Sequence, residues 1–216
     1  MRFSGVAAAG QALRHMLSRL RRLLSKLRRL YKSATVRRRR EDGLKMDFFD
    51  VVGVRQSIRA FAERPVEEEK LRKVLETANQ APSAGNLQAY EIFVVRRASD
   101  RKALARASHG QEFVAGAPLV LVFCARPGRA APKYGQRGIR LFATQDATIA
   151  CTFAMLGATA LGLATVWVGA FLDDDVRHAI RGSEEVFPVA ILPIGYAAEN
   201  PMPTGRRGIA DLAHEL

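Results

Sequence analysis

The sequence predicts one domain of mixed α and β structure that follows a basic N-terminal leader. The 216 residues are enough for one hydrophobic core, and 48% hydrophobic with 25% charged residues is ordinary for a globular protein. Helical and strand patterns are interspersed after residue 46, with helical patterns ahead of the first strand. No glycine-rich phosphate motif follows a strand, so neither a dinucleotide-binding fold nor a P-loop is supported.

The net charge of +13 belongs to the leader. Residues 1–40 contain 13 Lys or Arg residues and no acid, whereas residues 41–216 contain 21 basic and 21 acidic residues. Because the body is neutral, nucleic acid is excluded as its main partner.

Residues 13–31 carry apolar side chains at helical spacing with Arg and Lys on the other face, which predicts a basic amphipathic helix. Three interpretations are open: contact with an anionic membrane surface, an organelle transit segment, or translated upstream sequence ahead of a true start at Met46. In each case residues 1–45 form a leader outside the core fold, and residues 46–216 form the domain.

The first half of the domain is expected to contain three helices and two strands. The acids that follow Pro65 suit the first turn of a helix, and Ser99 is a candidate N-cap. The apolar run "APLVLVFCA" predicts a strand buried on both faces. The expected helices are 46–54, 66–81 and 99–108, and the expected strands are 90–96 and 117–125.

The second half is expected to begin with a loop, because residues 126–137 are rich in Pro, Gly and Arg. A long central helix rich in Ala and Leu follows, apolar almost all round. Three acids at 173–175 are expected to cap a later helix. The expected elements are helix 139–163, strand 164–171, helix 173–180, a proline-interrupted strand 186–197 and a loop-rich tail.

The two cysteines, Cys124 and Cys151, lie in apolar segments and are expected to be buried reduced thiols. A reducing compartment fits them, so a cytoplasmic location is expected, with organelle targeting by the leader left open. No Cys/His ligand spacing predicts a metal, and no run of 18 apolar residues predicts a membrane span. The histidines are not paired with an evident nucleophile, so no hydrolytic site is expected.

Four stretches carry residues suited to binding chemistry. In "RQSIRAF", Arg55, Ser57 and Arg59 offer two guanidinium forks and a hydroxyl to an anion, although a solvated basic turn would look the same. In "APSAGNLQAY", the amides of Asn86 and Gln88 can donate and accept toward a planar heterocycle, or simply cap the joint between a helix and a strand.

The other two stretches lie later in the chain. In "ATVWVGAF", Gly169 permits close approach of a ligand or another backbone, and Trp167 fits a core position equally well. In "PTGRRGIADL", Arg206 and Arg207 either complete a phosphate site or solvate the tail.

Taken in order, these four stretches resemble the nitroreductase family of flavoproteins over roughly residues 46–216. The resemblance implies an α+β fold, with a mostly antiparallel central sheet flanked by helices. It also implies an obligate homodimer with one FMN in each of two clefts at the interface.

The resemblance assigns the charged end of the flavin to one group of residues. Arg55 and Ser57 resemble phosphate ligands, Arg59 resembles the cation near the N1–C2 edge, and Arg206 or Arg207 resembles a further phosphate ligand. Gln56 belongs to the same stretch but stands where many relatives carry a second basic residue.

The remaining flavin contacts are implied for two other stretches. Pro82, Ser83, Asn86 and Gln88 resemble groups that the neighbouring subunit offers to the ring or the ribityl chain. The backbone of Val168, Gly169 and Ala170 resembles the stretch that passes the ring near N5.

The activity that the resemblance implies is FMN-dependent and uses NAD(P)H to reduce nitroaromatic, quinone or similar electron-poor acceptors by ping-pong hydride transfer. The flavin carries the chemistry, so no catalytic side chain is expected. The loop 126–137 either borders the substrate cleft, with Tyr134 and Arg137 selecting the acceptor or the nicotinamide, or faces solvent. Alternatives are a same-fold flavoenzyme with another reaction, such as flavin fragmentation or dehalogenation, and an interaction protein that acts through the leader.

Overall fold

The computed structural model describes residues 16–20, 23 and 46–216, and the chain divides into two compact units, residues 1–54 and 55–216. In the first unit, residues 16–20 and 23 are helical, and helix α2 spans Phe48–Val54 as expected. The rest of the predicted amphipathic helix lies outside the described residues.

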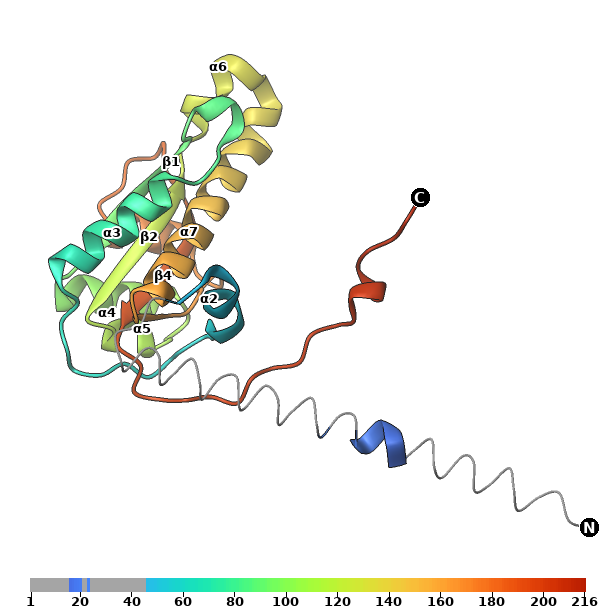
Figure 1. The fold of residues 1–216 in the computed structure, drawn as a ribbon. Helices are drawn as coiled ribbons and strands as arrows, with labels where there is room; N and C mark the ends of the chain where they lie inside the picture. The colour runs from blue at the N-terminus through green and yellow to red at the C-terminus, as the bar shows by residue number, and fades with distance from the viewer. Residues whose placement is uncertain (1–15, 21–22, 24–45) are drawn as a thin grey trace, which may run out of the picture. The chain divides into compact units, whose positions relative to one another are not determined.

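The second unit is built on a four-stranded sheet in the order β1-β2-β4-β3 (Figure 1). All three strand pairs are antiparallel, which confirms the α+β fold and the antiparallel sheet. The strands are β1 (Tyr90–Val95), β2 (Leu119–Ala125), β3 (Ala164–Thr165) and β4 (Phe187–Gly195).

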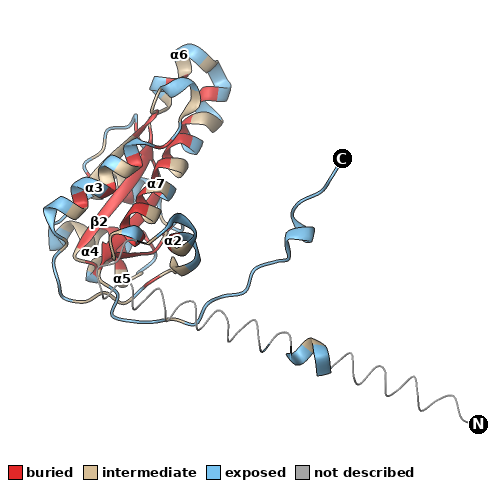
Figure 2. Cartoon of the chain, viewed as in Figure 1, coloured by how far each residue is buried: buried red, intermediate tan, exposed pale blue. Residues whose placement is uncertain are grey.

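Strand β2 is buried on both faces, as its continuous apolar run predicts (Figure 2). Successive side chains of a strand point to opposite faces, so Leu121 and Phe123 enter one hydrophobic core while Val122 and Cys124 enter the other. The helices that cover the first face are α3 (Glu68–Asn79) and α7 (Ala143–Ala160); those on the second face are α4 (Ala98–Ala107), α5 (Phe113–Gly116) and α8 (Asp173–Ala179).

Both cysteines are free and buried, as expected. Burial raises the pKa of Cys124 to about 12, with the charge of Glu91 as a smaller cause. Burial likewise raises the pKa of Cys151 well above its ordinary value. Both thiols therefore stay protonated, and they act as small core residues.

Helix α7 is the central helix that the sequence predicts. Small buried residues such as Ala147, Ala150 and Ala154 let it pack closely on α3 and on the sheet. The helical span 127–160 is long and apolar enough to cross a membrane by length and composition. In the described fold, however, the buried face of α7 belongs to the hydrophobic core.

The expected loop at 126–137 is wrong, because the chain forms helix α6 (Pro127–Arg137) and then a π-helical turn, η2 (Gly138–Phe142). Pro127 suits the first turn of a helix, and Ala130 is buried against other alanines, including Ala143 of α7. Gly135 bends the helix with φ of 52°. Packing on neighbouring alanines thus overrides a composition typical of loops.

Two smaller expectations also fail. Helix α4 begins at Ala98 after Arg97, so Ser99 lies inside the first turn and is not the N-cap. The strand expected at 164–171 shrinks to the two residues of β3 and one bridge from Val168 to Ile191. Pro193 of β4 faces this edge without an N–H to donate, which interrupts the ladder between these contacts.

A polar cluster joins the start of α3 to the residue that follows β4. The Tyr196 hydroxyl lies 2.8 and 2.7 Å from the two carboxylate oxygens of Glu67 and accepts from Lys70 Nζ at 2.8 Å. The hydrogen bond from Tyr196 is the main cause that lowers the pKa of Glu67 from 4.5 to about 2.

This cluster predicts a pH-dependent part of the stability. A carboxyl group whose pKa is lowered on folding stabilises the fold fully above its unfolded pKa, and this contribution is lost as the pH falls from about 4.5 toward 2. We expect the Tyr196→Phe variant to lose less unfolding free energy over this pH range than the wild type. Urea unfolding at a series of pH values measures the difference, and equal pH slopes in both proteins would contradict it.

Candidate functional site

The stretch around Arg55–Arg59 is extended backbone held at the end of the sheet where β4 finishes. Ser57 forms a parallel bridge with Thr165, and the Ile58 N–H donates to the Thr165 carbonyl at 3.0 Å. A few residues later, the Ala62 N–H donates to the Tyr196 carbonyl at 2.8 Å. The stretch is therefore a fixed part of the fold and not a solvated turn.

Glu199 fixes the backbone at Arg59, a contact that the sequence did not reveal. Its carboxylate accepts the N–H groups of Arg59 and, at 3.0 Å, of Ala60. The Arg59 side chain stays exposed, with its guanidinium carbon 5.9 Å from the centre of the Phe113 ring. The charge of Arg59 is thus available to a ligand.

Arg55 and Arg206 form a pair of like charges. The pKa of Arg55 is lowered, first by burial and second by the positive charge of Arg206. Arg206 donates to the Thr204 hydroxyl at 2.9 Å and is exposed. A bound anion would offset both the burial of the Arg55 charge and its repulsion by Arg206, so this pair of guanidinium groups fits a phosphate group. Of the two tail arginines, Arg206 is the one whose charge acts on Arg55.

The backbone at Val168–Ala170 leaves the sheet beside these residues. Val168 exchanges hydrogen bonds of 2.9 and 3.0 Å with Ile191, after which Gly169 and Ala170 are exposed. A Cβ on Gly169 would lie 3.1 Å from the indole nitrogen of Trp167, so this position favours glycine. Gln111 donates to the Ala170 carbonyl at 3.3 Å.

The fold brings eight of the predicted residues to this region, and we define them as the arginine half-site: Arg55, Gln56, Ser57, Arg59, Val168, Gly169, Ala170 and Arg206. Two residues near the start of α5 contact it and were not predicted from the sequence. Gln111 donates to the Ala170 carbonyl, and the Phe113 ring lies near the Arg59 guanidinium.

The second group of predicted residues lies on the joint between α3 and β1. The short turn η1 spans Ala84–Asn86, and Asn86 and Gln88 adopt positive φ values of 58° and 41°. The Gln88 N–H donates to Ser83 Oγ at 3.0 Å, and its side-chain amide donates to Asn86 Oδ1 at 2.7 Å. We define Pro82, Ser83, Asn86 and Gln88 as the amide half-site.

Asp146 of α7 holds the loop of the amide half-site in place through two hydrogen bonds. Its side chain is 2% exposed, and its carboxylate accepts the N–H of Ala84 at 2.9 Å and of Ala89 at 3.2 Å. This role was not predicted from the sequence, although Asp146 is the lone acid in the apolar helix "ATQDATIACTFAM". A buried carboxylate needs such donors, so the loop and the helix stabilise each other.

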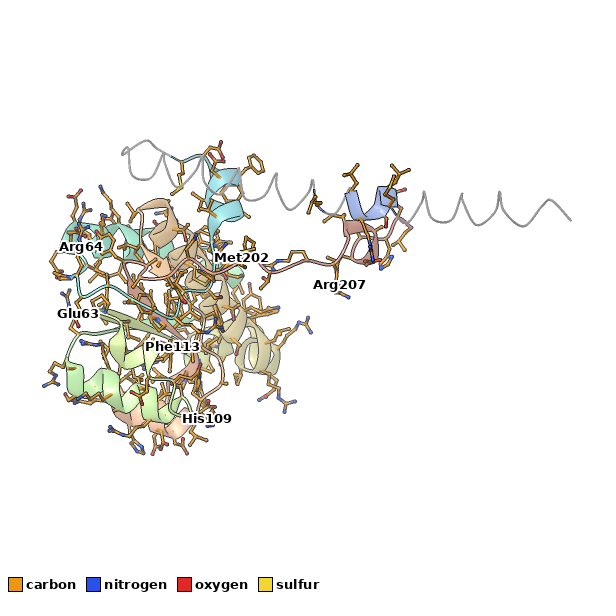
Figure 3. All side chains as sticks on the ribbon, turned by 90° about the horizontal axis from the view of Figure 1, so that it is seen from below. Glu63, Arg64, His109, Phe113, Met202 and Arg207 are labelled. Atoms are coloured by element: carbon orange, nitrogen blue, oxygen red, sulfur yellow. The ribbon has the colours of Figure 1, made fainter. Side chains whose placement is uncertain are left out.

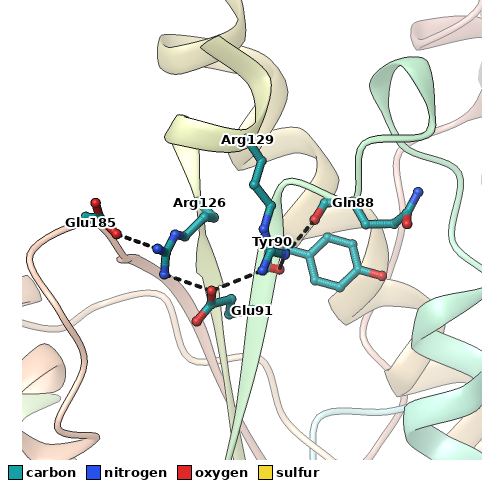
Figure 4. A network of polar contacts seen from close by, with 6 residues as sticks. All are labelled: Gln88, Tyr90, Glu91, Arg126, Arg129 and Glu185. Atoms are coloured by element: carbon teal, nitrogen blue, oxygen red, sulfur yellow. Dashed lines mark hydrogen bonds and ion pairs between the residues drawn. The ribbon is translucent and has the colours of Figure 1, made fainter. Parts of the chain in front are cut away.

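Helix α6 is hydrogen-bonded to the loop of the amide half-site (Figure 4). Arg129 donates to the carbonyls of Gln88 at 3.2 Å and Tyr90 at 2.9 Å. Arg126 forms ion pairs with Glu91, at 2.9 Å, and with Glu185. These contacts fix the start of α6 against the first residues of β1.

The two half-sites lie at opposite ends of the sheet. The amide half-site precedes Tyr90, which pairs with Ala125, and Ala125 pairs with Phe187 at the start of β4. Ser57 of the arginine half-site bridges Thr165, which pairs with Ile194 near the end of β4, whereas Val168 pairs with Ile191 at the middle of that strand. At about 3.3 Å per residue, Ser57 and the amide half-site are roughly 20 Å apart along the strands. One chain does not bring them together.

Comparison with known proteins identifies the fold and its class of chemistry. The model of the nitroreductase family matches residues 52–111 and 105–196, which include the core of both half-sites. The chain belongs to the nitroreductase family. This confirms the resemblance predicted from the four stretches, and it makes the chain an oxidoreductase of that family.

Several nitroreductase relatives cover most of the chain. It is 35% identical to the NADH dehydrogenase of Thermus thermophilus, with 70% of this chain and 87% of the relative covered. It is 30% identical to the FMN reductase [NAD(P)H] of Bacillus subtilis, with 67% and 63% covered. The structure of B. megaterium NfrA2 matches with a TM-score of 0.73 at 28% identity and covers 78% of this chain and 74% of that one.

The buried anchor of the amide half-site can be tested by substitution. We expect Asp146→Ala to lower the free energy of unfolding by about 2–4 kcal/mol, because the buried N–H of Ala89 and the partly buried N–H of Ala84 lose a charged acceptor. Hydrogen exchange at the Ala84 and Ala89 amides should speed up more than exchange in β2. Asp146→Asn, which keeps one carbonyl acceptor, should have the smaller effect. Unchanged exchange at both amides in Asp146→Ala would show that the anchor is dispensable.

Proposed function

We propose that the chain is an FMN-dependent NAD(P)H oxidoreductase that works as a homodimer. Each of two sites would combine the arginine half-site of one chain with the amide half-site of the other. The observation that carries this proposal is the placement of the two half-sites at opposite ends of one sheet. A second copy in the opposite direction can unite them, and a closed two-fold dimer then forms two equal sites.

The surface of the chain supports a second copy. Asp146 is the only charged residue of the 18 in α7, and it points inward, so the outer face of this helix offers no charge to water. The tail exposes Met202, Ile209 and Leu212 at 61%, 77% and 51%. Figure 3 labels Met202 on this tail. Uncharged helix faces and exposed apolar side chains of this kind are suited to burial in an interface.

The arginine half-site fits the anionic parts of FMN. Arg55 and Arg206 would hold its phosphate, with Ser57 beside them, and this would offset the repulsion between their charges. Arg59 would lie near the redox-active ring and stabilise negative charge there, and Gly169 would let the backbone approach the ring.

The amide half-site of the second chain would contact the ring or the ribityl chain through Asn86 and Gln88, which can donate and accept. When bound, FMN supplies the electron transfer between NAD(P)H and an electron-poor acceptor such as a nitroaromatic or a quinone. The names of the relatives, an NADH dehydrogenase and an FMN reductase, support this class of donor. The buried reduced thiols suit the cytoplasm.

The phosphate assignment predicts a loss of flavin affinity. Arg55→Ala should weaken FMN binding by on the order of 1.5–3 kcal/mol, which is about 10- to 150-fold in Kd, because a charge-assisted contact is removed. Fluorescence titration of the purified protein with FMN measures it. Arg106→Ala, an exposed arginine on α4, should leave the Kd unchanged. Equal Kd values for the Arg55 variant and the wild type would show that the phosphate binds elsewhere.

The two-chain site predicts complementation between variants. Arg55→Ala weakens one half-site, and Asn86→Gly removes an amide from the other while keeping a residue suited to positive φ. Each variant homodimer should bind FMN weakly at both sites. A heterodimer with one variant in each chain should have one intact site and bind one FMN with wild-type affinity.

Two differently tagged chains allow the heterodimer to be purified and titrated with FMN. Two weakened sites, with neither at wild-type affinity, would place all contacts within one chain and contradict the proposal. FMN binding at wild-type affinity without NAD(P)H oxidation, in the wild-type protein, would favour a different flavin reaction on the same fold.

A further inference from the structure

Helix α6 and the η2 turn carry an uncompensated positive charge. Residues 126–142 contain five basic residues and no acid. Arg126 and Arg129 form ion pairs with Glu91 and, for Arg126, also with Glu185. Among the described residues, Lys133, Arg137 and Arg140 have no acidic partner within ion-pair distance, and all three are exposed.

The first of these cations, Lys133, lies against the amide half-site. A Cβ on Gly85 would lie 2.5 Å from both Lys133 Nζ and Tyr134 Oη, so the two side chains rest on the turn η1. Gly85 has φ of 57°, a conformation that glycine adopts without strain. The turn therefore uses the one residue that lets Lys133 approach between Ser83 and Asn86.

Aromatic contacts hold Lys133 and Arg137 in place. The rings of Tyr134 and Phe142 meet edge to face, with their centres 5.0 Å apart. Lys133 Nζ lies 5.4 Å from the centre of the Tyr134 ring, and the Arg137 guanidinium lies 5.4 Å from that of Phe142. Together with the ion pairs at the start of α6, these contacts order a charged surface that has no acid to neutralise it.

We infer that Lys133, Arg137 and Arg140 bind the phosphate groups of the nicotinamide dinucleotide that donates the hydride. This inference rests on the proposed function, in which the amide half-site borders the flavin ring. The phosphate of FMN is assigned to Arg55 and Arg206 at the far end of the sheet, so these three cations remain for a second anionic ligand. Nitroaromatic and quinone acceptors need no anionic group, whereas the dinucleotide carries a pyrophosphate.

The number of cations also fits a dinucleotide. Three basic side chains are enough for a pyrophosphate together with the 2′-phosphate that distinguishes NADPH from NADH. The two sources of phosphate are separable by experiment, because NADH carries only the pyrophosphate.

The test compares three donors with the double variant Lys133→Gln/Arg137→Gln in the FMN-loaded protein. The donors are NADPH, NADH and dihydronicotinamide riboside, which transfers the same hydride but has no phosphate. Stopped-flow reduction of the flavin should show an apparent Kd raised about tenfold or more for NADPH, as expected for the loss of charge-assisted contacts. The value for the riboside should not change.

The apparent Kd for NADH shows which of the two phosphate groups the cations bind. An equal rise for NADH and NADPH assigns the cations to the pyrophosphate, and a rise confined to NADPH assigns them to the 2′-phosphate. A rise of the same size for all three donors, or no rise for either dinucleotide, would overturn the inference. Lys102→Gln, an exposed lysine of α4 that forms no ion pair with the described residues, is the matched control and should change none of the values.

A binding measurement keeps the inference separate from the proposed function. Calorimetric titration with 2′-phospho-ADP-ribose reports phosphate recognition without any electron transfer, and its affinity should fall about tenfold in the double variant. If the riboside reduces the flavin while calorimetry shows no difference between variants, the inference fails and the proposed function stands. If no donor reduces the flavin, the proposed function fails, and calorimetry still decides whether the cations bind phosphate.

Discussion

The antiparallel register of the sheet is the constraint on which the candidate site depends. Strand β2 is buried on both faces and pairs with β1 on one side and β4 on the other, so the direction of every neighbouring segment is set. The loop before β1 must emerge at one end, and the stretch that bridges β3 must lie at the other. The Arg55–Arg59 stretch and the amide half-site are therefore held in two places that a single rigid sheet cannot bring together.

Charged groups then hold each half-site in shape. Asp146 accepts hydrogen bonds from two N–H groups of the loop before β1, and Glu199 accepts from the N–H groups of Arg59 and Ala60. In both places a carboxylate satisfies backbone donors that the sheet does not pair. Asp146, the single charged residue of α7, thus binds the loop before β1, and the outer face of that helix remains uncharged.

Helix α6 begins beside the amide half-site and ends in an exposed, basic segment. Its first turn is neutralised by Glu91 and Glu185, whereas its end and the η2 turn present cations without acids. Ion pairs therefore fix the start of this segment, and under the proposed function its unpaired cations would recognise an anionic ligand.

The sequence by itself determined the elements with strong periodicity, the double burial of β2, the buried thiols and the four binding stretches in their order. These features depend on local spacing and composition. Tertiary structure alone decided that 127–137 is a helix, that β3 is short, and that the binding stretches occupy opposite ends of the sheet. The partners concerned are far apart in the chain: Arg59 and Glu199 are separated by 140 residues, and Ala84 and Asp146 by 62. No local pattern encodes which carboxylate reaches which backbone N–H, because that choice follows from the packing of the helices on the sheet.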